Sequence, residues 1–151
     1  GGNKDVMDVI GGGNVTHAGT FGGNGLSMAA AKAILDILTA SPVLDNIAQR
    51  GERLKVGLDQ ILTEANLPHQ MTGHPNIQSF LITENPVKEV RDFAHTDEEM
   101  YVKILTHLYH LGVWAEGDSR EPWFLCESHS NEIIDETLNK FQEAVKRTLD
   151  K

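Results

Sequence analysis

The fold class is set by residues 70–86, which read QMTGHPNIQSFLITENP. Residues 77–82 form an extended run rich in branched and aromatic side chains, and a shorter run covers residues 70–72. Between them lies the turn sequence Gly-His-Pro at 73–75, and residues 84–86 end the second run with Glu-Asn-Pro. Extended runs bounded by turn residues predict two strands joined by a tight connection.

Helical periodicity surrounds this hairpin, because apolar residues recur every three or four positions on both sides of it. Two further short strands are predicted at residues 113–115 and 123–127. The expected helices cover residues 5–10, 25–40, 42–65, 96–111 and 131–149. This order predicts an α+β fold, with helices packed on one face of a small, mostly antiparallel sheet.

Cap residues place the helix starts. Ser41 followed by Pro42 predicts the N-cap and first residue of the third helix. Thr96 is the expected N-cap of the fourth helix, with Glu99 completing a capping box, and Ser130 is the expected N-cap of the last one. The helix at 25–40 is apolar on most of its circumference, which is typical of a buried helix.

Charge and composition narrow the possible partners. The chain has 151 residues, with 22 acidic against 13 basic side chains and a formal net charge of −9. This charge disfavours nucleic-acid binding, because it repels the phosphate backbone. No apolar run approaches the ~20 residues of a membrane span, and no signal peptide opens the sequence. The single cysteine, Cys126, suits a reducing compartment, so a cytoplasmic location is expected.

The histidines do not predict a metal site. His107 and His110 lie three residues apart on one expected helix, but a zinc site needs three or four converging ligands. We therefore expect no metal in this chain. His129 precedes the last helix, where its expected role is to orient the turn.

The remaining reactive and aromatic side chains lie near the C-terminal strands. Cys126 falls within the predicted strand 123–127, where it is interpreted as a small buried hydrophobic residue. Trp114, Trp123 and Phe124 either line a pocket or fill the core of the small sheet, and the sequence favours neither.

A glycine-rich connection spans residues 17–24, His-Ala-Gly-Thr-Phe-Gly-Gly-Asn. Its glycines allow the backbone to approach a partner and to direct N–H groups at an anion, and Thr20 adds a hydroxyl. The connection precedes a helix N-terminus, which favours phosphate. From the residues alone, a phosphate-binding loop and a structural hinge both remain open.

Residues 17–30 resemble the A-G-T-[FL]-x-G-N-P-L-x-M-x-A segment of class III aminotransferases. Within that class the similarity is greatest to the glutamate-1-semialdehyde 2,1-aminomutases. Three more segments, residues 1–7, 112–124 and 128–138, resemble family segments in the same order. Gly25 replaces the proline that the family usually has in the first segment.

The resemblance implies the fold and the roles of particular residues. Residues 41–151 would form the C-terminal small domain of a fold type I pyridoxal-phosphate enzyme, and residues 1–40 the end of its large cofactor-binding domain. Gly19 and Thr20 would bind the phosphate of pyridoxal phosphate (PLP) across a homodimer. Glu121 would lie at the entrance for a small amino-acid-type substrate, although Arg120 replaces an aromatic residue of that segment.

The resemblance also implies that the catalytic residues lie outside this sequence. The family holds PLP as an imine on a lysine upstream of the segment that residues 1–7 match, and the chain opens without methionine, as though cut from a longer protein. We therefore expect no catalytic residue in this chain, and inactivity when it is alone. Its lysines are expected on helix faces, loops or termini: residues 4, 32, 55, 88, 103, 140, 146 and 151.

The alternative is a stand-alone, non-catalytic α+β binding or interaction module. The two hypotheses differ in the surface that they predict. A part of a larger enzyme should expose apolar side chains along residues 5–40, because those residues would pack against a missing domain. An independent module should have a polar surface there.

Overall fold

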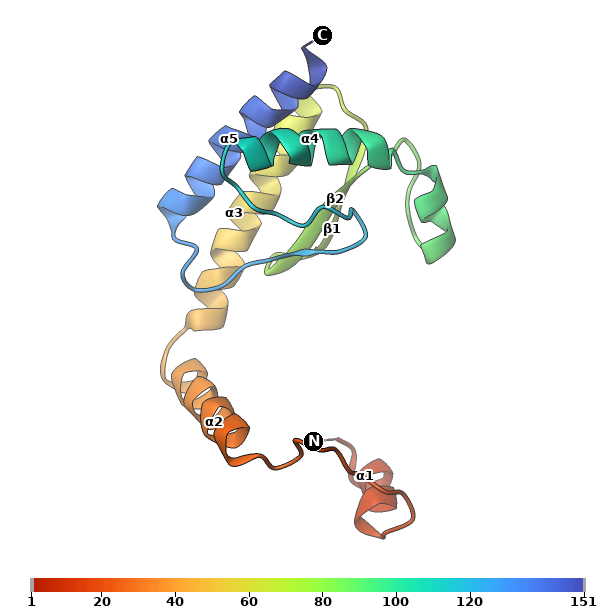
Figure 1. Cartoon of the computed structure of the whole chain (residues 1–151), viewed down its shortest axis with the longest axis vertical. Helices are drawn as coiled ribbons and strands as arrows, with labels where there is room; N and C mark the ends of the chain where they lie inside the picture. Colours follow the sequence, from red (N-terminus) through yellow and green to blue (C-terminus); the bar gives the residue numbers. More distant parts are fainter. Residues whose placement is uncertain (1, 151) are drawn as a thin grey trace. The chain divides into compact units, whose positions relative to one another are not determined.

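The computed structural model describes residues 2–150 (Figure 1). The chain separates into two compact units, one ending at Ser41 and the other beginning at Pro42. The first unit holds α1 (Lys4–Gly11) and α2 (Gly25–Ala40). The second holds all three strands and the remaining helices.

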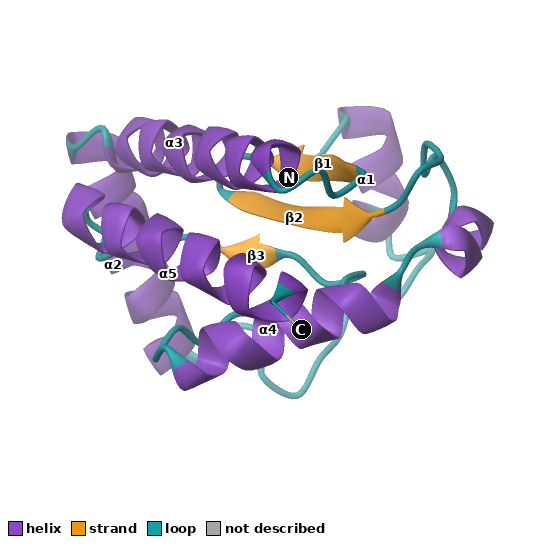
Figure 2. Cartoon of the chain, turned by 90° about the horizontal axis from the view of Figure 1, so that it is seen from above, coloured by secondary structure: helices purple, strands orange, loops and turns teal. Residues whose placement is uncertain are grey.

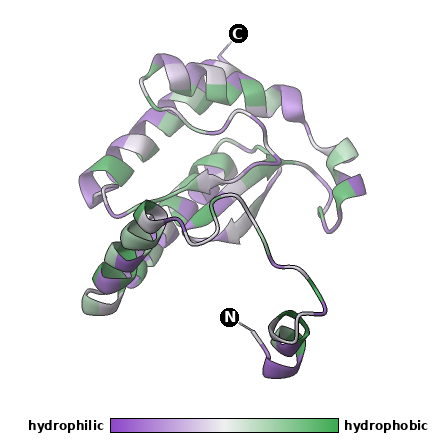
Figure 3. Cartoon of the chain, turned by 60° about the horizontal axis from the view of Figure 1, so that its bottom comes forward, coloured by the Kyte–Doolittle hydropathy of each residue, from purple (hydrophilic) through white to green (hydrophobic). Residues whose placement is uncertain are grey.

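In the first unit both helices form where the sequence predicts them. Asn3 caps α1 by accepting a hydrogen bond from the Asp5 amide at 2.9 Å. The expected burial of α2 is wrong, because none of its residues is buried. Figure 3 shows hydrophobic residues along much of this helix. Its apolar composition creates the need for a partner surface.

The second unit is α+β, as predicted from the hairpin and the surrounding helices (Figure 2). Its sheet has the order β1-β2-β3, and both pairings are antiparallel. The elements in chain order are α3 (Val43–Glu64), β1 (His69–His74), β2 (Ile77–Ile82), the 3-10 helix η1 (Val90–His95), α4 (Glu98–His110), β3 (Trp123–Phe124) and α5 (Asn131–Leu149).

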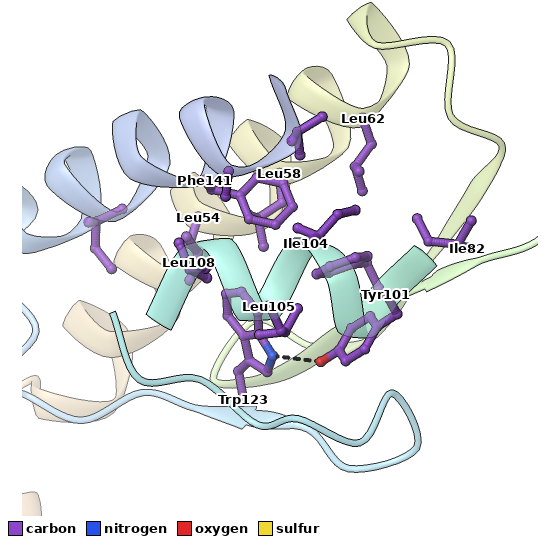
Figure 4. Packing of buried hydrophobic residues seen from close by; sticks show 14 residues of the cluster. Leu54, Leu58, Leu62, Ile82, Tyr101, Ile104, Leu105, Leu108, Trp123 and Phe141 are labelled. Carbon is purple, nitrogen blue, oxygen red and sulfur yellow. Dashed lines mark hydrogen bonds between the residues drawn. The ribbon is translucent and has the colours of Figure 1, made fainter. Parts of the chain in front are cut away.

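The hydrophobic core lies where α3, α4 and α5 meet the sheet (Figure 4). Phe80 of β2 is fully buried at its centre, and its ring centroid lies 4.8 Å from that of Tyr101 and 5.3 Å from that of Phe141. Edge-to-face and tilted contacts of this kind are favoured by the charge distribution of aromatic rings. The apolar stripes of the three helices therefore converge on one aromatic centre.

Two helix starts differ from the prediction. Ser41 does not cap α3, because Pro42 holds the N-cap position and no side chain caps this helix. Ser41 instead ends α2, where its amide donates to Ile37 O at 3.1 Å. Asp97, not Thr96, caps α4, and its carboxylate accepts from the Met100 amide at 2.9 Å. The Asp97 amide donates to Ile82 O at the end of β2, and this tertiary bond selects Asp97 over its neighbour. Ser130 caps α5 as predicted.

The C-terminal strands are shorter than predicted. Residues 113–115 form no strand, because the Ala115 carbonyl accepts from the Tyr109 hydroxyl instead of from a neighbouring strand. Strand β3 contains only Trp123 and Phe124, and Cys126 lies beyond it, exposed. The interpretation of Cys126 as a buried strand residue is therefore wrong.

Within residues 2–150, no single helix is long and apolar enough to cross a membrane, and α2 and α3 reach that threshold only when they are counted together.

Candidate functional site

The glycine-rich loop closes through two successive turns. The Gly22 amide donates to Gly19 O at 2.9 Å, and the Asn24 amide donates to Phe21 O at 3.0 Å. Gly23 has a φ of 73°, which strains any residue with a side chain. Thr20 and Phe21 therefore occupy the exposed tip of the first turn.

The loop leads directly into the N-terminus of α2. Asn24 caps this helix, and its side-chain oxygen accepts from the Ser27 amide at 3.1 Å. Helix N-termini carry partial positive charge and free N–H groups, so they favour anions. The loop and the start of α2 together form a surface that can attract a phosphate.

The groups on this surface fit a phosphate. A Cβ added at Gly19 would meet nothing within 4 Å, so its backbone is open to an approaching ligand. The Thr20 hydroxyl makes no hydrogen bond to any residue between 2 and 150, and it is free to donate. His17, Ala18 and the three glycines of the turn line a hollow beside it. Backbone amides and a hydroxyl are the donors that phosphate oxygens accept from.

Glu121 lies in the second unit, at the end of a loop that spans residues 115–122. Its amide donates to Asp118 O at 3.0 Å, and its side chain is exposed. Arg120 is exposed and paired within the loop, since its Nε donates to Asp118 Oδ1 at 2.8 Å and its Nη2 to the other carboxylate oxygen. This fork lowers the pKa of Asp118 to about 2 and raises that of Arg120. Where the family resemblance expects an aromatic residue, the structure thus has a neutralised ion pair.

An apolar cavity of about 220 Å³ lies between the 113–116 segment, β3 and α5. Both interpretations of the aromatic residues hold in part. Trp123 is buried in the core, whereas Trp114 is 92% exposed and Phe124 is 67% exposed, and all three line this cavity. Sequence periodicity could not distinguish a residue that lines the cavity from one that fills the core, because this difference depends on where β3 begins and ends.

The turn before α5 is held from two sides. The Cys126 amide donates to His129 Nδ1 at 3.0 Å, so the predicted role of His129 in orienting this turn is confirmed. Arg50 of α3 donates to Glu127 O at 2.8 Å. Sequence analysis missed Arg50, because a single basic residue between apolar positions of a helix carries no signal of its partner.

The other candidate groups are dispersed. Residues 2–150 contain no cluster of three or more potential metal ligands. The seven lysines of the same range are all exposed or half-buried. Gly19 and Thr20 belong to the first compact unit and Glu121 to the second.

The chain is similar to known proteins over both the glycine-rich loop and the second unit. The family model described as aminotransferase class-III matches residues 1–145. Glutamate-1-semialdehyde 2,1-aminomutase from Aquifex aeolicus is 30% identical over 147 residues, covering 97% of this chain and 35% of the relative. The aminomutase from Thermus thermophilus is 31% identical over 146 residues, with 95% and 34% covered.

A solved structure shows the same fold. The FumI protein of Sphingopyxis sp. MTA144, in its PLP internal aldimine form, superimposes with a TM-score of 0.80 at 21% sequence identity. The match covers 98% of this chain and 32% of FumI. The chain spans about a third of the length of the curated relatives that it matches. Because the family match includes both the glycine-rich loop and nearly all of the second unit, the chain belongs to the class-III aminotransferase family.

Proposed function

We propose that this chain contributes the phosphate-binding loop and one substrate-side loop of a PLP-dependent aminotransferase or aminomutase. Family membership and the two named aminomutase relatives support this proposal. The carrying observation is the open Gly19–Gly22 turn, where a free Thr20 hydroxyl lies at the entry to α2. The reaction would move an amino group within or between small amino and oxo acids.

Each residue has a definite task in this proposal. The backbone of Gly19 and the hydroxyl of Thr20 hold the cofactor phosphate, reaching it from the partner subunit of a homodimer. Glu121 faces the substrate entrance as a carboxylate. Residues 1–40 belong to the large cofactor-binding domain and residues 41–151 to the small one. PLP, when bound, supplies an electron-withdrawing ring that stabilises charge on the carbon next to the amino group.

As a separate polypeptide the chain is proposed to be inactive. An imine-forming lysine needs a lowered pKa, which burial or a neighbouring cation provides. None of the lysines between residues 2 and 150 is buried, which supports a lysine elsewhere in the complete protein. We expect that adding PLP to the chain alone produces no saturable absorbance band beyond that of a non-specific lysine control. A saturable band assigned to one lysine would overturn this part of the proposal.

The coding sequence upstream of Gly1 tests the proposal directly. An open frame with a lysine about a dozen residues before Gly1, inside a glycine-rich turn, is the expected result. A stop codon at that place would instead favour the non-catalytic module.

The role of Thr20 is tested in the protein joined to its upstream region. Thr20→Ala should weaken PLP binding at least about tenfold, because a hydrogen bond to a charged group contributes roughly 1.5–3 kcal/mol. Thr20→Ser keeps the hydroxyl and serves as the matched control. Pyridoxal, which lacks the phosphate, should bind equally to all three proteins. Equal PLP affinity in Thr20→Ala and wild type would remove Thr20 from the site.

A further inference from the structure

Side-chain hydroxyls of the core donate hydrogen bonds to backbone carbonyls of the loop at residues 115–122. The Tyr109 hydroxyl donates to Ala115 O at 2.7 Å, and the Tyr101 hydroxyl donates to Glu116 O at 2.7 Å. Ser79 adds a longer bond to Ser119 O at 3.4 Å. The donors stand on α4 and β2, so rigid elements of the core hold three carbonyls of the loop.

Tyr101 anchors the loop to the deepest part of the core. Its ring is fully buried against Phe80, and its hydroxyl accepts a hydrogen bond from Trp123 Nε1 at 3.1 Å (Figure 4). Burial raises the pKa of Tyr101 to about 12, so this hydroxyl stays protonated and able to donate. The Glu116 carbonyl is therefore tied to the aromatic centre of the fold.

Tyr109 holds the outer part of the same loop. Its ring is stacked on the exposed Trp114, with a centroid distance of 5.4 Å and an interplanar angle of 27°. A Cβ added at Gly117 would lie 3.0 Å from the Tyr109 hydroxyl, so the loop passes tightly over this group. Tyr109 is half-buried, and replacing its hydroxyl disturbs the core less than the same change at Tyr101 would.

The charged side chains of the loop are used within the loop, with the exception of Glu121. Glu116 Oε1 accepts from the Gly117 amide at 2.9 Å, and Asp118 is paired with Arg120. Glu121 has no side-chain hydrogen bond or ion pair to any residue between 2 and 150. The loop therefore satisfies its own charges and leaves one carboxylate available.

We propose that Tyr109 and Tyr101 are positioning residues, which fix the 115–122 loop so that Glu121 is presented in one place. This inference rests on the proposed function of Glu121 at the substrate entrance. A loop that is ordered before the substrate arrives loses less conformational entropy on binding. The Tyr109 hydroxyl thus acts on the substrate through Glu121, without touching it.

The first test uses amide hydrogen exchange on this chain. Tyr109→Phe should speed the exchange of the Gly117, Arg120 and Glu121 amides about tenfold, while the amides of β2 and the urea midpoint stay unchanged. Thr106→Val is the matched control, because it removes a hydroxyl of α4 that donates at 2.8 Å to Val102 O within the helix. It should leave loop exchange unaltered. Equal loop exchange in Tyr109→Phe and wild type would overturn the proposal, whatever the role of Glu121.

The second test uses the protein joined to its upstream region. Tyr109→Phe should raise KM for the amino substrate several-fold with kcat nearly unchanged, and Glu121→Gln should raise KM as well. In the double variant the effect of Tyr109→Phe should vanish, because no carboxylate remains to be positioned. A KM effect that persists beside Glu121→Gln would overturn action through Glu121. If Glu121→Gln alone changes nothing, the proposed role of Glu121 fails and the positioning role with it, even where the exchange test shows a freed loop.

Discussion

At Gly51, α3 lies close against the turn of the β1–β2 hairpin. A Cβ at this position would lie 2.2 Å from Pro75 O, and the buried Gln78 side chain donates to Gly51 O at 2.8 Å. Gly51→Ala must therefore push the helix from the hairpin. We expect a net loss of about 1 kcal/mol in the free energy of unfolding, since overpacking costs roughly 1–3 kcal/mol and the gain in helix propensity offsets about 1.

Urea unfolding followed by circular dichroism measures this loss. Gly57→Ala, on the same helix, is the control, because the three atoms nearest to its Cβ all belong to the Leu138 side chain, which can move. The smaller loss should belong to Gly57→Ala. If Gly51→Ala is as stable as the wild type or more stable, the hairpin turn moves away from the new methyl group without loss of stability, and the prediction is wrong.

Tyr101 predicts a fall in stability at alkaline pH. Its pKa is about 12 in the fold, against about 10 in an unfolded chain. Between these values the unfolded state loses the proton while the folded state keeps it, so stability is complete below pH 10 and declines as pH rises toward 12. The decline from this residue amounts to roughly 3 kcal/mol at most.

Comparing urea midpoints at pH 8.5 and pH 11 isolates this effect. In Tyr101→Phe the contribution disappears, so the midpoint of the variant should change less between the two pH values than that of the wild type. Identical changes in the two proteins would assign the alkaline loss to other groups.

At the scale of elements, the start of α4 is the most direct test of capping. Asp97→Ala removes the acceptor for the Met100 amide and should cost about 1 kcal/mol of stability. Asp97→Asn keeps an acceptor oxygen and should retain most of it. Thermal unfolding of the three proteins at one pH measures the difference, and an Asn variant as unstable as the Ala variant would assign the effect to the charge instead.

The same helix shows what sequence patterns can and cannot determine. Apolar spacing located α4, α5 and the hairpin, because helix and strand periods are local properties of the chain. The choice of Asp97 over Thr96 depends on a hydrogen bond to Ile82 O, a residue remote in sequence. The lost strand at 113–115 has a similar cause, since Tyr109 takes the Ala115 carbonyl that a strand partner would need.

In the candidate site, too, some residues could be found from the sequence and others only from the tertiary fold. Gly19, Thr20 and Glu121 were located by resemblance to a family, because a single glycine, threonine or glutamate carries no signal of its partner. The hydroxyls beneath the 115–122 loop were not predicted, because Tyr101 and Tyr109 lie on a helix face where aromatic residues are typical of core packing. Only the tertiary fold brings their polar ends to the loop carbonyls.

At the scale of the whole molecule, the core is confined to one of the two compact units. Every member of the buried cluster lies between Leu54 and Val145, so no residue before Ser41 takes part in it. Apolar side chains of α2 are exposed instead, with Leu26 at 85% and Leu35 at 61%. Exposed apolar surface along residues 5–40 is what the hypothesis of a larger enzyme predicts, and a partner surface is needed to cover it.

From the confined core and the exposed apolar side chains of α2, we expect that deleting residues 1–41 leaves the stability of the second unit unchanged but reduces self-association. The urea midpoint of the second unit should stay within about 0.5 kcal/mol of the intact chain, a margin typical of changes outside the core. Concentration-dependent self-association in sedimentation velocity, and binding of a hydrophobic dye, should decrease sharply.

The double variant Leu26→Gln and Leu35→Gln should reproduce that decrease in the intact chain, whereas Lys32→Gln, on the same helix, should not. An intact chain that remains monomeric and binds no dye would show that α2 is covered from within the chain, and the proposed contact with a further domain would then lose its physical basis.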